Sequence, residues 1–337
     1  MPSEKRALPS SISGYFHWVP IWIDQKVDYT DSKKRKERVL TAELPHGITA
    51  FVQREGIFAF EFSEKGWGFI DPSEFLEDVT NPIHIEAVLK KTRLLNVHLA
   101  CLYAALTKLN RMALPKMLLT PQELLSSRSI EDGLTMSPMS STAAQTHYIN
   151  SGSFANSELA WIHVKRHQII PIEVVRLSFD IFSEILTNEN EYLIDMVELI
   201  LRGVKYYEDH DYNSSLIMYW AVIEKIINTI WNNFLESQRN RPTGTNQKFI
   251  NRARKEKLTG IDYTISNIIE YLSLLNLVSF SLYRDLNIVR TARNKWIHDL
   301  KAVDQETCTT AYFTVTKLFK AMFNLDFQIA PISQMPF

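Results

Sequence analysis

Cysteine is scarce in this chain. Its 337 residues include only two, Cys101 and Cys308, and both lie within apolar stretches. Two cysteines cannot supply the several bridges of a small disulfide-stabilised secreted scaffold. We therefore expect two buried thiols in a reducing cytoplasm rather than a disulfide.

Long hydrophobic runs and known catalytic signatures are also missing. No apolar run reaches the ~18–20 residues that a membrane-spanning helix requires. The N-terminal region shows no Gly-rich phosphate loop, no nucleophile elbow and no metal-binding signature, and this argues against an enzyme centred there. The net charge is only −1, so any nucleic-acid binding must come from a local patch of basic residues. These features, with no signal peptide visible at the start of the chain, predict a cytoplasmic protein without a membrane partner.

The patterns that are present predict an α+β protein with two domains. Residues 1–170 are expected to form a mixed domain, because short aromatic and β-branched runs within 15–70 predict strands. Ile83–Asn110 carries a helical repeat of leucines without glycine or proline, and this predicts one long helix. Residues 126–157 are rich in Ser, Thr, Gly, Asn and Met, and we expect them to form a long mobile loop.

Residues 171–337 are expected to form a separate all-helical domain. Apolar residues recur there at helical spacing, interrupted by short polar breaks. The predicted helices cover residues 172–187, 190–207, 214–237, 263–275, 278–300 and 305–323, with a short basic helix after residue 244.

The most informative stretch is Arg290–Asp299. On a helix, Arg290, Asn294 and His298 would fall at i, i+4 and i+8 and would share one face. Arg293 lies beside that face with a side chain long enough to reach it. A cation, an amide and an imidazole near a helix end can bind a phosphate and transfer protons.

The segment Arg293-Asn294-Lys295-Trp296-Ile297-His298 resembles the Arg-Asn-x-x-x-His motif of HEPN domains. The resemblance covers about residues 189–325. It implies a helical bundle, and many HEPN domains are ribonucleases that use neither a metal nor a cofactor, in bacterial defence and toxin systems. It also implies that two copies of the motif meet across a homodimer, so the second copy would come from another chain.

A carboxylate on an earlier predicted helix belongs to the same hypothesis. Glu224 resembles the acidic or polar position of the HEPN helix that faces the Arg-His motif, so we count it with the candidate catalytic residues Arg293, Asn294 and His298. An equally good interpretation makes Glu224 an edge carboxylate with an i, i+4 contact on its own helix.

The most basic tract lies between residues 238 and 260. Arg252, Arg254 and Lys255 are candidate contacts to an RNA backbone, and Arg290 and Lys295 would add positive charge near the motif. The alternative is a solvated loop and helix face, and the sequence favours neither interpretation.

Other histidines and basic residues have simpler interpretations. Arg93 and His98 repeat the motif's spacing, but they lie in a strongly apolar segment without the adjacent asparagine, so we expect His98 to be a core or boundary histidine. His163 and His167 have the i, i+4 spacing of a helical metal pair, but no further ligand pattern accompanies them. The cluster Lys33–Lys36 is expected to form a solvated loop.

The predicted chemistry is RNA cleavage by the substrate's own 2′-hydroxyl. His298 would transfer protons, Arg293 would stabilise the developing charge on phosphorus, and Asn294 would orient one of them. The first domain would sense or regulate, by binding a trigger or a regulator. The alternative is a catalytically silent bundle for dimerisation or nucleotide binding, in which Arg293 and His298 only tie the helix end.

Overall fold

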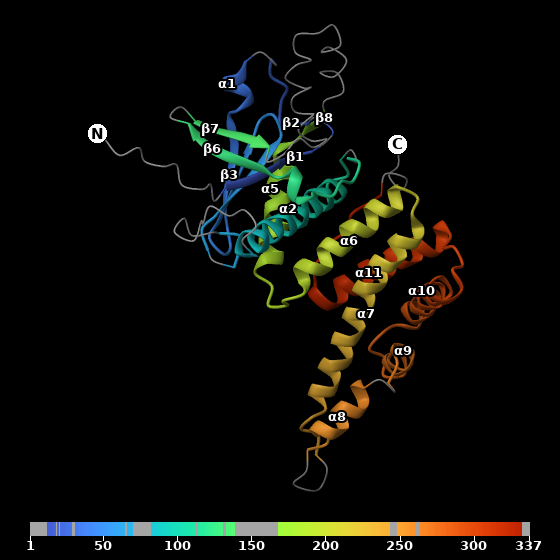
Figure 1. Cartoon of the computed structure of the whole chain (residues 1–337). Coiled ribbons are helices and arrows are strands. Elements are labelled where there is room, and N and C mark those ends of the chain that lie inside the picture. Colours follow the sequence, from blue (N-terminus) through green and yellow to red (C-terminus); the bar gives the residue numbers. More distant parts are fainter. Residues whose placement is uncertain are drawn as a thin grey trace. The chain divides into compact units, whose positions relative to one another are not determined.

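The computed structural model describes residues 12–17, 19, 21–28, 31–64, 66–69, 82–111, 114–130, 133–138, 168–242, 248–260 and 263–331. The protein is α+β, with strands in the N-terminal part and helices in the C-terminal part (Figure 1). The chain divides into two compact units between Leu201 and Arg202, within helix α6. The sequence placed this boundary near residue 170. It lies later because helix α5 (Ile172–Leu186) packs against α2 (Pro82–Lys108) and β3, which belong to the first unit.

The first unit is built on an antiparallel sheet of six strands in the order β3-β4-β5-β1-β6-β7. Its strands are β1 (Ile12–Phe16), β3 (Arg38–Leu44), β4 (Ile48–Gln53), β5 (Ile57–Phe62), β6 (Leu125–Ile130) and β7 (Gly133–Pro138). A second, two-stranded parallel sheet pairs β2 (Ile21–Ile23) with β8 (Gln168–Ile170). Two short helical pieces complete the unit, α1 (Ser32–Arg35) and the 3-10 turn η2 (Pro121–Glu123). The basic cluster at 33–36 was expected in a loop, but most of it forms α1, which Asp31 caps at the N-terminus.

Strands β6 and β7 contradict the predicted mobile loop over its first part. They pair antiparallel, and β6 also pairs with β1 through Ser13 opposite Ser126. Backbone hydrogen bonds hold such strands whatever their side chains are, so a polar, Ser-rich composition concealed them. Residues 139–157, together with His163 and His167, lie outside the described residues.

The central strand β5 is buried on both faces, as its nearly continuous apolar sequence requires. Ile57 and Ala59 join Phe51 and Leu125 in a core cluster on one face. Because side chains alternate along a strand, Phe58 and Phe60 point to the opposite face, where their rings approach His98 of α2.

The sequence predicted His98 to be a core or boundary histidine, and the structure places it in the core. It is fully buried, its Nδ1 lies 2.9 Å from the Tyr15 hydroxyl, and its Nε2 lies 3.3 Å from Ser178 Oγ. Burial lowers the pKa of His98 to about 3, so the imidazole is neutral near pH 7. Arg93 of the same segment forms an ion pair with Asp195 at 2.8 Å. Arg93 and His98, which repeat the spacing of the motif, therefore have a structural role.

The second unit is helical. It comprises the end of α6 (Leu193–Glu208), then α7 (Tyr212–Ser237), α8 (Arg252–Thr259), α9 (Ile265–Leu274), α10 (Phe280–Asp299) and α11 (Gln305–Phe323). Side-chain caps begin most of these helices: Asp211 for α7, Ser279 for α10 and Asp304 for α11 each accept a backbone N–H of the first turn. The predicted helices therefore exist close to their expected bounds.

Helices α6, α7 and α11 are joined at one close crossing. A Cβ added to Gly203 would lie 2.4 Å from the Tyr219 ring, so only glycine allows α6 and α7 this approach. Ser215 Oγ donates to the Gly203 carbonyl at 2.7 Å and accepts from the Cys308 thiol at 3.1 Å. Cys308 and Cys101 are both buried free thiols, as predicted. Among the described helices, none is long and apolar enough to cross a membrane.

Candidate functional site

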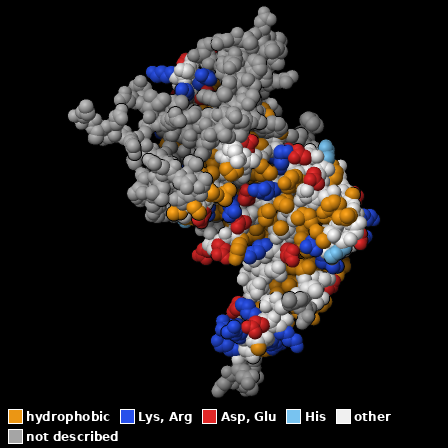
Figure 2. All heavy atoms as spheres, in the orientation of Figure 1, with side chains coloured by type: hydrophobic (Ala, Val, Ile, Leu, Met, Phe, Trp, Pro, Cys, Tyr) orange, Lys and Arg blue, Asp and Glu red, His pale blue; other side chains and the backbone are white. Residues whose placement is uncertain are grey.

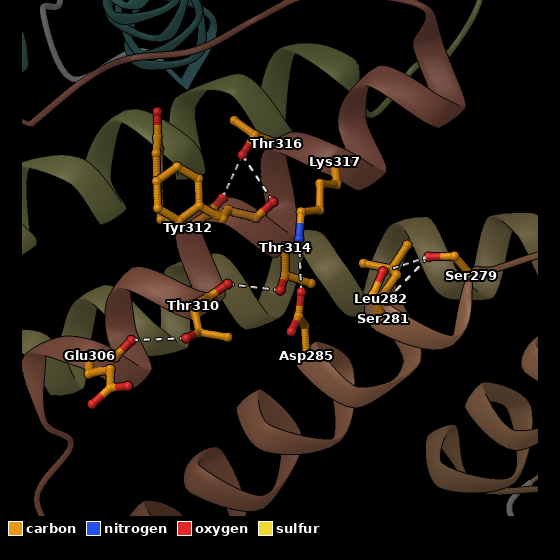
Figure 3. Close-up of polar contacts among 11 residues, drawn as sticks. Ser279, Ser281, Leu282, Asp285, Glu306, Thr310, Tyr312, Thr314, Thr316 and Lys317 are labelled. Carbon is orange, nitrogen blue, oxygen red and sulfur yellow. Dashed lines mark hydrogen bonds and ion pairs between the residues drawn. The ribbon is translucent and has the colours of Figure 1, made fainter.

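Helix α10 carries the Arg-Asn-x-x-x-His segment, and packing within the second unit holds it in place. Its buried residues Leu282, Leu286 and Val289 face the bundle, where α10 packs against α7, α9 and α11. An ion pair of 2.9 Å between Asp285 Oδ2 and Lys317 Nζ joins α10 to α11 (Figure 3). The hydroxyls of Thr310, Thr314 and Thr316 donate to carbonyls of α11 itself. Among the side chains drawn in Figure 3, the polar contact between α11 and α10 is therefore the ion pair of Lys317.

Arg290, Asn294 and His298 share one stripe of α10, because the helix includes all three positions. Arg290 and Asn294 are half-buried, whereas His298 is exposed. Arg290 donates from Nε and Nη2 to Asn287 Oδ1 at 3.4 and 3.3 Å. Within the part of the chain that the structure describes, the His298 ring makes no hydrogen bond, so both its nitrogens are open to a ligand.

Arg293 does not lie on that open stripe. It follows Leu282, Leu286 and Val289 at helical spacing, and therefore continues the face that α10 turns toward the bundle. Its Nε is buried without a hydrogen-bond partner, and its Nη1 donates to Asn294 Oδ1 at 3.1 Å. The hydrogen bond directs one edge of the guanidinium toward the stripe of His298.

The end of α10 is marked by an apolar residue in an unusual conformation. Leu300 has φ of 51°, in the left-handed region, and its N–H bonds back to the helix at Trp296. Glycine or asparagine normally fills this position. The side chain of Leu300 is 74% exposed and that of Ile297 is 46% exposed. Two apolar side chains therefore flank His298 in the sequence and face solvent.

Glu224 lies on α7 within a stripe of buried residues, between Trp220 and Ile227. Farther along this stripe, Trp231 stacks on Tyr263 just before α9. Glu224 is half-buried, and among the described residues neither the expected i, i+4 contact nor a hydrogen bond to Arg293 is formed. Its catalytic role stays a prediction.

The basic tract forms α8, which Figure 1 places at the lower end of the second unit, away from α10 and α11. Lys and Arg side chains gather on this end of the molecule (Figure 2). Each candidate cation there already has a partner in the chain. Arg252 pairs with Glu256 at 2.8 Å, Lys255 pairs with Glu236, and Arg254 donates to the Phe249 carbonyl at 2.9 Å.

The first unit contains a cavity of about 530 Å³ that the sequence reasoning missed. In its wall the His46 ring stacks on the Trp67 ring with centroids 3.7 Å apart, and the Lys90 ammonium lies 4.7 Å from the same indole. The end of α5, together with Glu189 and Glu191, also lines the cavity, and His46 Nε2 lies 3.0 Å from the Leu186 carbonyl oxygen there. These residues are far apart in the sequence and form no motif, so no local signal indicated them. In the described ranges, no group of three or more His, Cys, Asp or Glu side chains could hold a metal ion.

No protein-family model, curated protein or solved structure matches this chain. The resemblance to HEPN domains therefore depends on the α10 segment and its helical surroundings alone.

Proposed function

We propose that the second unit is a HEPN-type endoribonuclease that cleaves RNA without a metal ion or cofactor. The observation that carries the proposal is the end of α10. There an exposed His298 with no partner in the described chain shares a stripe with Asn294, and Asn294 holds Arg293 by a hydrogen bond of 3.1 Å.

The reaction would proceed by general acid–base catalysis. Neutral His298 takes the proton of the RNA 2′-hydroxyl while the 2′-oxygen attacks the adjacent phosphorus. The bond from phosphorus to the 5′-oxygen breaks, and the leaving oxygen takes a proton from a second, protonated histidine. The products carry a 2′,3′-cyclic phosphate and a 5′-hydroxyl. Arg293 contributes Nη2, which makes no hydrogen bond within the described ranges, to the negative charge of the phosphorane.

The second histidine would come from another copy of the chain. One chain offers one such segment on α10, and a two-fold axis would bring two segments to one phosphate. Leu300 and Ile297 supply the apolar surface for this contact beside His298. An exposed leucine in a left-handed conformation is unfavourable in an isolated chain, and a contact with a second copy would give it a role. We thus propose a homodimer through the C-terminal helices.

The biological role that we propose is based on the resemblance to HEPN domains. A bacterial toxin or antiviral effector in the cytoplasm would need its ribonuclease restrained until a signal arrives. The first unit, with its cavity beside Trp67 and Lys90, would bind that trigger or regulator.

A second candidate function is favoured by one observation. Arg293 lies on the buried face of α10 and bonds to its own neighbour, as expected of a side chain that ties a helix end in a silent dimerisation or nucleotide-binding module.

The deciding experiment incubates purified full-length protein with mixed RNA, with and without EDTA. The proposal expects cleavage in both, cyclic phosphate ends, and loss of cleavage in His298→Ala and Arg293→Ala. Wild-type cleavage by both variants would refute the assignment, and a requirement for magnesium would refute the chemistry.

A further inference from the structure

A groove runs between α10 and the start of α11, on the side of α10 next to the stripe of His298. Its cavity measures about 480 Å³, within the range of small-ligand sites. It is lined by Asn287, Ile288, Thr291, Ala292, Lys295, Lys301, Ala302, Val303, Asp304 and Thr307. Asn287 and Thr291 precede Asn294 and His298 along α10 at helical spacing, so one edge of the groove leads toward His298.

The groove contains two cations that the fold itself does not use. Lys295 and Lys301 are exposed, and neither forms an ion pair with any residue in the described ranges. Their backbones are joined where the left-handed turn closes α10, by the Lys301 N–H bonded to the Lys295 carbonyl at 3.2 Å. The turn therefore holds the two lysines at the same end of α10.

The rest of the lining is apolar or hydroxylated. Ile288 is 49% exposed, and Ala292, Ala302 and Val303 add further aliphatic surface. Such a surface can contact the face of a flat ring, and the hydroxyls of Thr291 and Thr307 can bond to ring edges or ribose.

The N-terminus of α11 does not serve as the anion site of this groove. Asp304 already accepts the Thr307 N–H at 2.7 Å, and this bond lowers the pKa of the Asp304 carboxyl, so the carboxylate stays ionised. It would repel a phosphate at the helix end. Positive charge in the groove therefore comes from Lys295 and Lys301.

We propose that this groove seats one unpaired nucleotide of the RNA, next to the phosphate that is cut. The base lies on Ile288, Ala292 and Val303, and the backbone phosphate lies on Lys295 and Lys301. The assignment rests on the proposed ribonuclease function, and it adds the substrate class, which is single-stranded RNA. A base within an A-form duplex is stacked and paired, so it cannot enter a groove between two helices.

The test measures binding without cleavage. Full-length His298→Ala protein is titrated into a fluorescent single-stranded 2′-O-methyl RNA, which has no free 2′-hydroxyl, and anisotropy is followed at several salt concentrations. We expect Lys295→Ala and Lys301→Ala each to weaken binding and each to reduce the salt slope by about 0.7, the value for one phosphate contact on a single strand. Ile288→Glu should weaken binding further, because it places a carboxylate under the base.

Lys320→Ala is the matched control, since Lys320 is also an exposed lysine, on α11 but outside the groove lining. It should bind with unchanged affinity and slope. A blunt RNA duplex of the same length should bind more weakly than the single strand.

The outcomes separate this proposal from the ribonuclease itself. If both lysine variants keep the original affinity and salt slope, or if the duplex binds as well as the single strand, the groove assignment is wrong even in a protein that cuts RNA. If the lysine variants lose binding but the wild type never cuts RNA, the groove is upheld and the ribonuclease proposal fails.

Discussion

Arg293 donates a hydrogen bond to the side chain of its own neighbour, Asn294, while its Nε is buried without a partner. A buried, unpaired donor on a cation is costly, so this arrangement does not favour stability. Such a cost is expected where a charge is held ready for a ligand. The two interpretations of Arg293, catalytic or structural, therefore predict opposite effects on stability.

Replacing Arg293 by methionine tests this contrast. The apolar side chain fills the buried stripe and removes the unpaired donor, so the free energy of unfolding should stay the same or rise by about 1 kcal/mol. RNA cleavage should fall by at least about 100-fold, as when one charge-stabilising group is removed. Urea unfolding and a cleavage assay measure the two effects. A loss of more than about 2 kcal/mol with cleavage retained would assign Arg293 to the structural role.

His298→Ala should abolish cleavage and leave stability unchanged. The ring is exposed and has no hydrogen-bond partner in the described chain, so little in the fold depends on it. Removal of a general base should cost at least about 100-fold in rate. His210→Ala is the control, because His210 is another exposed histidine of the same unit, and its ring nitrogen Nδ1 lies 2.9 Å from the Tyr212 hydroxyl. Arg93→Ala should also keep activity, because Arg93 and His98 repeat the motif's spacing but have a structural role.

The dimer proposal predicts two opposite effects from one substitution at Leu300. Leu300→Gly removes a side chain from a left-handed position, so the protein in its monomeric form should gain about 1 kcal/mol of stability. It also removes the most exposed apolar side chain beside His298, so dimerisation should weaken. Calorimetry and analytical ultracentrifugation measure the two effects.

Mixing experiments test the shared site directly. Arg293→Ala chains mixed with wild-type chains should form heterodimers whose activity lies below the value expected from dilution. A protein that remains monomeric at working concentration and still cuts RNA would contradict the shared site.

The basic helix α8 can be tested independently of the motif. Charge reversal at Arg252, Arg254 and Lys255 should weaken RNA binding and flatten its salt dependence, if these residues release counterions from RNA. Each must then exchange its exposed partner in the chain for a phosphate, and this exchange costs little because exposed ion pairs are weak. An unchanged salt slope would mean that α8 is a solvated surface that does not bind RNA. The ion pairs of Arg252 with Glu256 and of Lys255 with Glu236 are compatible with that interpretation.

His98 predicts how the first unit responds to acid. Its pKa is about 3 in the folded protein and about 6.5 in an unfolded chain, so between these values the unfolded chain binds more protons. Acid therefore favours unfolding. From about pH 7.5 to about pH 5, this residue should remove about 2 kcal/mol from the free energy of unfolding. In His98→Gln that part of the pH dependence should vanish, and an unchanged slope would mean that His98 is not the cause.

The sequence alone determined most helices of this protein. Helical spacing and capping are local properties, so Leu282, Leu286 and Val289, with Ser279 before them, were enough to place α10. The same local logic put Arg290, Asn294 and His298 on one stripe and marked His98 as a core residue.

Only the tertiary structure decided which elements meet. Strand pairing depends on distant partners, so β6 and β7 were hidden in a Ser-rich segment until β1 provided an edge for β6. The path of the chain between helices carried α8 away from α10 despite their closeness in sequence. Packing of α10 turned Arg293 toward the bundle. The turn at Leu300 brought Lys301 beside Lys295, because a left-handed residue reverses the backbone at the end of a helix.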